Sequence, residues 1–435
     1  MASQNSSYQV IIAGAGPVGL LTALRLGQEN IRTLVLEAHH ELLPTTRAMV
    51  YMPVVNRCLD QLGLTEVLRK HAYHNRTGVT WRNKDCNQLA HLSLPTDDNG
   101  IFGGSYQIGQ ARMSELILDK LRSYNSVEVK FGMRVAGIED DENDTVKVMA
   151  HQAKTSGNDG NDVFFKTKYV LAADGNNSAV RRLLCISFDG FTFDEFKMVG
   201  TDILFDYQKE FGWSSLNFFV DPEHWAVIAY TGQDGGTLDN PEDSRPLWRV
   251  AFAEPSDLPT TKEELHKRAH DRVKLYLKGR EDYKLVRAEL YWLHQRCAAQ
   301  AFKGRVFLAG DALHSNNPIG GLGLTGGILD AYAYGNALTR VIQHGEPDSL
   351  LADCTNSRRD AWLNTTSQLV IGNLYRLKDT EGKHAEQRKE FIEKLNSDPD
   401  FPAQFRKNFD MMIPHTFEAV PKTISLVERT TPAAQ

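Results

Sequence analysis

Residues 8–19 of the chain read YQVIIAGAGPVG, and this stretch decides the fold. Residues 8–13 form a short apolar run, which is typical of a parallel strand covered on both faces. Three glycines follow, and apolar residues then recur with a helical period through residues 20–30. Gly14 permits a tight turn, Gly16 lets the backbone approach a pyrophosphate, and Gly19 lets helix and strand pack closely. The stretch predicts a strand, a phosphate-binding turn and a helix.

A second strand, residues 33–37, completes a βαβ unit whose crossover should be right-handed. Pro17 and Val18 open the helix, where free N–H groups and the helix dipole favour negative charge. Glu37 ends the second strand, about 20 residues after the glycines, where an acid binds an adenosine ribose. The pattern predicts a Rossmann-type α/β fold but does not separate FAD from NAD. The alternative is a glycine-rich turn that binds no ligand.

Two later motifs select FAD. Asp174-Gly175, with Ser178 and Arg181 beyond it, follows a strand at residues 169–173, and Gly310-Asp311 follows another at 306–309. A carboxylate at a strand end can accept hydrogen bonds from the ribityl chain of a flavin. Just beyond, the turn 318–323 can place backbone N–H groups against the flavin ring, where they stabilise the negative charge of the reduced form.

With these motifs the chain resembles the group A flavoprotein monooxygenases, aromatic hydroxylases with the para-hydroxybenzoate hydroxylase fold. The resemblance extends from Val10 to about Leu338. It implies that Asp174 and Arg181 serve both FAD and NAD(P)H, and that Asp311 holds the ribityl chain. Thr325 stands where the family often has Asn. The expected cofactor-binding residues are Gly14, Gly16, Pro17, Val18, Gly19, Glu37, Arg47, Gln110, Asp174, Arg181, Gly310, Asp311, Gly321, Gly323, Leu324 and Thr325.

The resemblance also implies a reaction. NADH or NADPH reduces FAD, O2 forms a flavin C4a-hydroperoxide, and its distal oxygen hydroxylates a phenolic or other aromatic small molecule. Epoxidation, dearomatisation or decarboxylative hydroxylation of a larger natural product is the nearest alternative. A non-catalytic flavin-binding protein is an alternative of another class. A flavin halogenase is disfavoured, because Trp213 is followed by Ser-Ser-Leu rather than by the halogenase Trp-x-Trp-x-Ile-Pro element.

The catalytic candidates are Pro318, expected beside flavin and substrate, and His224 and Tyr230, either of which could remove a phenol proton. His314, next to the Gly-Asp motif, is interpreted as structural. No metal site is expected, because neither the His39-His40 pair nor His71 with His74 has a third ligand nearby.

The fold class expected is α/β: a Rossmann-type FAD-binding domain interleaved with a β-sheet substrate domain, and a helical C-terminal part. Residues 1–80, 105–188 and 288–345 are assigned to the FAD-binding domain. Residues 81–104 and 189–287 are assigned to the substrate domain, since 191–230 alternate like strands and are rich in aromatics. Residues 346–435 form the helical segment.

Composition narrows the cellular setting. The chain has 435 residues and a net charge of −6, so we expect no nucleic-acid partner, because binding to phosphates requires a basic surface. The five cysteines form no CxxC pair, and with no secretory signal we expect a cytoplasmic protein. No transmembrane segment is expected, because glycines and a proline interrupt the apolar stretch 10–26. A homodimer is left open.

Overall fold

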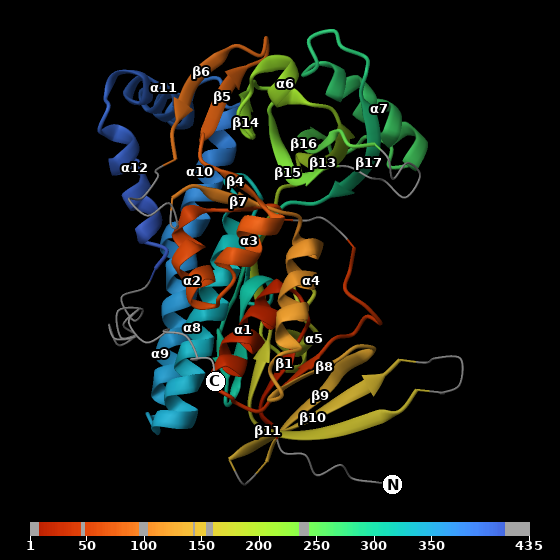
Figure 1. Cartoon of the computed structure of the whole chain (residues 1–435), viewed down its shortest axis with the longest axis vertical. Helices are drawn as coiled ribbons and strands as arrows, with labels where there is room; N and C mark the ends of the chain where they lie inside the picture. Colours follow the sequence, from red (N-terminus) through yellow and green to blue (C-terminus); the bar gives the residue numbers. More distant parts are fainter. Residues whose placement is uncertain are drawn as a thin grey trace, which may run out of the picture.

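The computed structural model of the chain describes residues 8–44, 48–94, 103–141, 144–153, 160–234 and 243–413. Its strands form one sheet of eight strands and another of seven, besides two sheets of three strands. Helices flank the eight-stranded sheet and run up one side of the molecule toward the seven-stranded sheet (Figure 1). The expected α/β class is confirmed.

The eight-stranded sheet brings the ends of its parallel strands together. Its main order is β19 (Phe302–Lys303), β20 (Val306–Leu308), β11 (Asp162–Ala172), β1 (Tyr8–Ala13), β2 (Thr33–Leu36) and β8 (Val127–Lys130). β10 (Thr145–Gln152) pairs antiparallel with β11, and β9 (Met133–Asp141) pairs antiparallel with β10. Because β1 runs parallel to β2 and β11, and β11 parallel to β20, their carboxyl ends meet at one edge. All three sequence motifs follow these ends.

Three helices build the core beside this sheet. α1 (Pro17–Gln28) contacts both α4 (Gln110–Leu121) and α8 (Leu322–His344). Their inward residues, among them Leu20, Leu24, Ile117 and Leu329, share one apolar cluster with β1. The long α8 therefore supports the glycine turn after β1 from behind.

Two local expectations differ from the structure. The sequence of residues 59–69 predicts one helix, but the structure divides it between α2 (Asn56–Gln61) and α3 (Thr65–His71), with Gly63 between them at φ +68°. Within the stretch expected as strands, α6 (Tyr207–Phe211) forms because the Asp206 side chain accepts a hydrogen bond from the Lys209 N–H. Both differences arise from local backbone chemistry that apolar spacing does not reveal.

The seven-stranded sheet has the order β17 (Lys284–Tyr291), β13 (Phe196–Leu204), β16 (Pro246–Pro255), β15 (Ala226–Asp234), β14 (Leu216–Val220), β5 (Val79–Asn83) and β6 (Gln88–Leu92). α7 (Lys262–Lys274) covers one face, over buried Trp248 and Phe252. Residues on the other face line a cavity described below. These strands lie close to the ranges assigned to the substrate domain, and the domain division stays a prediction.

Short sheets connect the two large ones. β3 (Val50–Tyr51), β7 (Ser105–Gln107) and β4 (Tyr73–Asn75) form one of them. β12 (Phe188–Thr192), β18 (His294–Ala298) and β21 (His314–Ser315) form the other. β21 follows η2 (Gly310–Ala312), so the second short sheet is built directly onto the Gly-Asp motif.

The last described helices span both sheets. α9 (Ser349–Ala361) packs on α8 and continues through the π-helix η3 (Trp362–Thr366) into α10 (Ser367–Lys378), which contacts β14. α11 (Gly382–Ser397) contacts β6, and α12 (Phe401–Asp410) follows it (Figure 1). Within the described ranges, no helix is long and apolar enough to cross a membrane.

A buried charge cluster joins α8, α9 and the Gly-Asp motif. The Asp330 carboxylate is fully buried, accepts hydrogen bonds from the Gly310 N–H (2.9 Å) and Arg358 Nε (2.6 Å), and lies 2.9 Å from His314 Nε2. Burial alone would raise the pKa of Asp330, but the charges of His314 and Arg358 hold it well below its usual range. Asp330 therefore fixes the Gly310 turn through a carboxylate that stays ionised.

We expect Arg358→Met to destabilise the protein by about 3–5 kcal/mol, because it leaves a buried carboxylate without its main partner. Arg340→Met is the matched control. Arg340 pairs with Glu346 at the surface, where such a pair is worth about 1 kcal/mol or less. Urea unfolding followed by circular dichroism measures both. Equal losses in the two variants would show that the buried cluster has no special role.

Candidate active site

The three sequence motifs line a single cavity of about 1310 Å³ at the edge where the parallel strands end. The lining includes most of the expected site residues, namely Gly14, Gly16, Pro17, Val18, Glu37, Gln110, Asp174, Gly310, Asp311, Pro318, Gly321, Gly323 and Leu324. Gly19, Arg181, Thr325, His224 and Tyr230 are not in it. Arg47 lies outside the described residues.

The first glycine turn has the geometry that a pyrophosphate requires. Gly14 has φ +102°, and a Cβ there would lie 2.4 Å from the carbonyl oxygen of Ala173. A Cβ on Gly19 would lie 2.0 Å from the Gly14 oxygen, whereas one on Gly16 would meet nothing within 4 Å. No side chain caps the start of α1, and its first turn has no acidic residue. The N–H groups beside Gly16 therefore suit a bound anion.

Glu37 is held at the adjoining strand end. Its carboxylate accepts hydrogen bonds from the Ala15 N–H (2.7 Å) and the His39 N–H (2.9 Å). Because an ionised carboxylate has about four acceptor positions, it can also accept from the hydroxyls of a ribose. The distance from the glycine turn to Glu37 is fixed by the Ala15 hydrogen bond.

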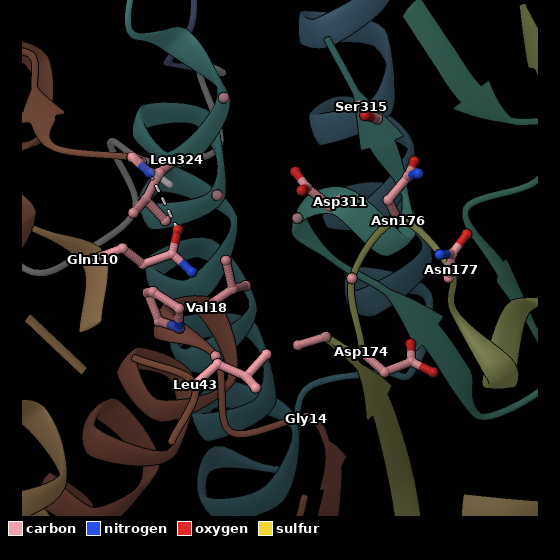
Figure 2. A pocket seen from close by; sticks show the side chains of 18 of the residues that line it. Gly14, Val18, Leu43, Gln110, Asp174, Asn176, Asn177, Asp311, Ser315 and Leu324 are labelled. Atoms are coloured by element: carbon pink, nitrogen blue, oxygen red, sulfur yellow. Dashed lines mark hydrogen bonds between the residues drawn. The ribbon is translucent and has the colours of Figure 1, made fainter. Parts of the chain in front are cut away.

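Asp174 and Asp311 lie at the ends of β11 and β20. One Asp174 oxygen caps α5 (Ala179–Leu183) by accepting from the Ala179 and Val180 N–H groups at 2.7 and 3.1 Å. Its other oxygen, Oδ1, is buried without a hydrogen-bond partner in the described part of the chain. Such an acceptor is costly unless a ligand or water satisfies it. Figure 2 shows Asp311 across the cavity from Gln110 and Leu324, so its exposed carboxylate can reach a polyhydroxyl chain.

The turn before α8 supplies a second helix N-terminus. Gly320 and Gly321 have φ of +115° and +68°, and no side chain caps the helix. Thr325 is fully buried; its hydroxyl donates to the Gly321 oxygen (2.7 Å) and accepts from the Met52 N–H (3.3 Å). Thr325 therefore shapes the turn from behind. The uncapped N–H groups suit the negative charge of a reduced flavin.

Arg181 has a different environment from the one expected. Its guanidinium donates to the Ala312 oxygen (2.9 Å) and the Asn176 oxygen (2.8 Å), and lies 3.7 Å from the centre of the Phe188 ring. Burial lowers its pKa, although the charge of Asp174 acts in the opposite direction. Arg181 ties the Asp174 motif to the Gly-Asp motif. A contact with the nicotinamide nucleotide stays a prediction.

His224 and Tyr230 do not reach the cavity. The Tyr230 ring packs against Tyr73 and Trp248, with centroids 5.1 and 5.6 Å apart. The backbone of His224 accepts from the Tyr276 hydroxyl in a loop before β15. On β15 the neighbouring Ala229 lines the cavity instead, because side chains alternate between the faces of a strand.

The face of the seven-stranded sheet contributes residues that the sequence did not single out. Apolar side chains from β14, β15 and β16 line one part of it, namely Leu216, Phe218, Val227, Ala229 and Ala251. Arg249, Arg287 and Tyr291 line another part, where both guanidiniums lie 2.8 Å from the carboxylate of buried Asp202. Alternation along β17 predicts that Arg287 and Tyr291 lie on the same face of the sheet. It does not predict whether that face lines the cavity.

His294, at the start of β18, lines the cavity beside the seven-stranded sheet, whereas the other lining histidine, His39, follows β2 and Glu37. Its Nδ1 lies 2.9 Å from the Thr192 hydroxyl, which orients the ring. Burial and the nearby charge of Arg296 lower its pKa below the ordinary histidine value. A neutral imidazole is therefore favoured at neutral pH.

The comparisons with known proteins agree with this site. The sequence profile of the FAD binding domain family matches residues 7–367. The chain is 33% identical over 382 residues to para-nitrophenol 4-monooxygenase of Pseudomonas sp. strain WBC-3, which covers 86% of this chain and 88% of that protein. It is 32% identical over 381 residues to 6-hydroxy-3-succinoylpyridine 3-monooxygenase of Pseudomonas putida S16, covering 86% and 91%.

Solved structures give the same result. The p-nitrophenol 4-monooxygenase from Pseudomonas putida DLL-E4 superposes with a TM-score of 0.83 at 30% identity, covering 94% of this chain and 99% of that one. The uncapped helix N-termini, the orphaned Asp174 oxygen and the projecting Asp311 carboxylate all fit FAD. The chain therefore belongs to the FAD-binding group A flavoprotein monooxygenases, the family of aromatic hydroxylases.

Proposed function

We propose that the protein hydroxylates a small phenolic substrate, with FAD as cofactor and with NADH or NADPH and O2 as co-substrates. The observation that carries this proposal is the continuity of the FAD cavity with the apolar face of the seven-stranded sheet. Leu216 and Phe218 offer a flat apolar wall there, which suits a single aromatic ring. The relatives named above, by their names, act on a nitrophenol and a hydroxypyridine.

FAD, when bound, supplies the electron transfer and the activated oxygen. The chain's own residues position it and exclude water. The α1 N-terminus and Glu37 hold the ADP part, Asp311 holds the ribityl chain, and the α8 N-terminus stabilises negative charge on the ring. The apolar sheet face removes water from the place where the aromatic ring reacts.

A phenol reacts faster as its phenolate, so a proton acceptor in the cavity assists the reaction. His294 lies in the lining, and its lowered pKa favours the neutral imidazole, which can accept a proton. Thr192 holds the ring through Nδ1, which leaves Nε2 for the substrate. We assign His294 this role in place of His224 and Tyr230. A cytoplasmic location and a homodimer remain predictions.

The proposed function is tested on the purified protein. Phenols should accelerate NADH or NADPH oxidation, and the product should be heavier than the substrate by one oxygen atom in mass spectrometry. Stimulation only by polycyclic aromatics would favour the natural-product alternative. Bound flavin with no stimulation by any aromatic would indicate a flavin-binding protein without turnover.

Asp311→Ala should weaken FAD binding by about 10- to 100-fold, because hydrogen bonds to a charged acceptor contribute about 1.5–3 kcal/mol. The visible absorbance of flavin per protein, during titration with FAD, measures the change. Asp353→Ala is the control, since Asp353 is exposed on α9 and does not line the cavity. Undiminished flavin content in Asp311→Ala would contradict the assignment of the ribityl site.

His294→Gln should lower kcat/KM for a phenol that is neutral at the assay pH by about 100-fold or more, as expected for loss of a general base. In the unaltered protein kcat/KM should decline with a midpoint on the acidic side of the ordinary histidine pKa of about 6.5, because the pKa of His294 is lowered and the protonated ring cannot accept the proton. This acidic decline should vanish in the variant. His151→Gln, on β10, should keep the profile unchanged. An identical acidic decline in His294→Gln would exclude the proposed role.

A further inference from the structure

A second cavity, of about 570 Å³, lies beyond the wall of the first. It is enclosed by β5 and β6 on one side and by α10, α11 and α12 on the other, which stand together in Figure 1. Leu216, Phe218, Ile319 and Gly320 line both cavities. Because Ile319 and Gly320 belong to the flavin turn, the second cavity borders the place where the flavin ring is expected.

Most of the second lining is apolar and aromatic. Trp81 stacks on Phe218 with centroids 5.7 Å apart, and meets the edge of Phe391 at 5.0 Å. Phe401, Phe405 and Phe409 of α12 continue this surface. A cavity of this size with aromatic walls suits a planar ligand of one or two rings.

Arg376 brings a positive charge into this apolar lining. It lies on α10, and its Nη2 donates to Asn373 Oδ1 at 2.5 Å. Among the described side chains, no carboxylate forms an ion pair with it, and burial lowers its pKa. Arg376 is half-buried, and a partly desolvated guanidinium without a counter-charge favours the binding of a complementary anion.

Asn373 links this guanidinium to the flavin turn. Its Nδ2 donates to the Ile319 oxygen at 3.4 Å, and a Cβ on Gly320 would lie 2.6 Å from the same nitrogen. Arg376 is therefore separated from the flavin turn by one side chain. An anion bound to it would lie at the end of the cavity nearest the cofactor.

Three other charged groups of the lining are engaged by hydrogen bonds or ion pairs, and the fourth, Lys407 on α12, is exposed. Arg388 donates to the backbone oxygens of Arg376 (2.8 Å) and Asp379 (2.7 Å), so it fastens α11 to the end of α10. Glu390 pairs with Lys394 at 2.7 Å. Arg376 is thus the charged group of the lining best placed to meet a ligand.

We propose that Arg376 binds the negatively charged oxygen of an acidic aromatic in the second cavity, and that this cavity is a phenolate-binding site separate from the one in which His294 faces the reacting substrate. The inference rests on the proposed phenol hydroxylation. It adds a second binding position, selective for the charged form of the substrate, and the residue that selects it.

The test uses the FAD-loaded protein with 4-nitrophenol, whose phenolate has its own visible absorbance, and 4-nitroanisole as an uncharged analogue of similar shape. Arg376→Gln should weaken 4-nitrophenol binding by about tenfold or more, the effect of losing a charge-assisted hydrogen bond, and change 4-nitroanisole binding little. The pKa of bound 4-nitrophenol should lie below that of the free compound, and rise by about one unit in the variant. Arg376→Lys should retain part of both effects.

Arg388→Gln is the matched control, and any loss it causes should be equal for the two ligands. Equal weakening of both ligands by Arg376→Gln, or an unchanged pKa of the bound phenol, would overturn the inference. If the unaltered protein hydroxylates phenols but the Arg376→Gln variant still prefers the phenolate, the inference is rejected and the proposed function stands. Phenolate selection through Arg376 in a protein that hydroxylates no phenol would support the inference and reject the function.

Discussion

The close approach of two backbones at Gly14 sets the position of the elements around the cavity. The turn after β1 passes so near Ala173, at the end of β11, that a Cβ at Gly14 would lie 2.4 Å from the carbonyl oxygen. Gly19 then brings α1 still closer to the same turn, since a Cβ there would lie 2.0 Å from the Gly14 oxygen. Since a side chain at either position would separate strand from strand or helix from turn, the common edge of β1, β2, β11 and β20 depends on these two glycines.

The second constraint is electrostatic. The buried Asp330 carboxylate, on α8, accepts a hydrogen bond from the Gly310 N–H and lies against the side chains of His314 and Arg358. Buried ion clusters of this kind add little net stability, but removing one member is expensive. The cluster therefore fixes positions rather than adding stability. It orients the start of η2, from which Asp311 projects, and through Arg358 it connects α9 to the flavin site.

Local signals in the sequence were sufficient for the fold and for bringing most of the expected cofactor residues to one cavity. The glycine turn, Glu37 and the Gly-Asp motif each follow a strand end, and parallel strands place such ends together. The residues proposed for the substrate side could not be found in this way. His294 and Arg376 reach their cavities through packing between segments distant in sequence, and alternation along β15 gives no sign that Ala229, rather than Tyr230, faces inward.

The unbroken rod formed by α9, η3 and α10 has a consequence for engineering. It carries Arg358, which supports the Gly-Asp motif, and further along Arg376, which lines the second cavity. In chimeras with relatives, exchanging the whole rod would transfer cofactor support and ligand preference as a unit. A crossover placed within the π-helical turn at Trp362–Thr366 would separate them, because α10 could then be replaced while the parental Asp330 partner is kept.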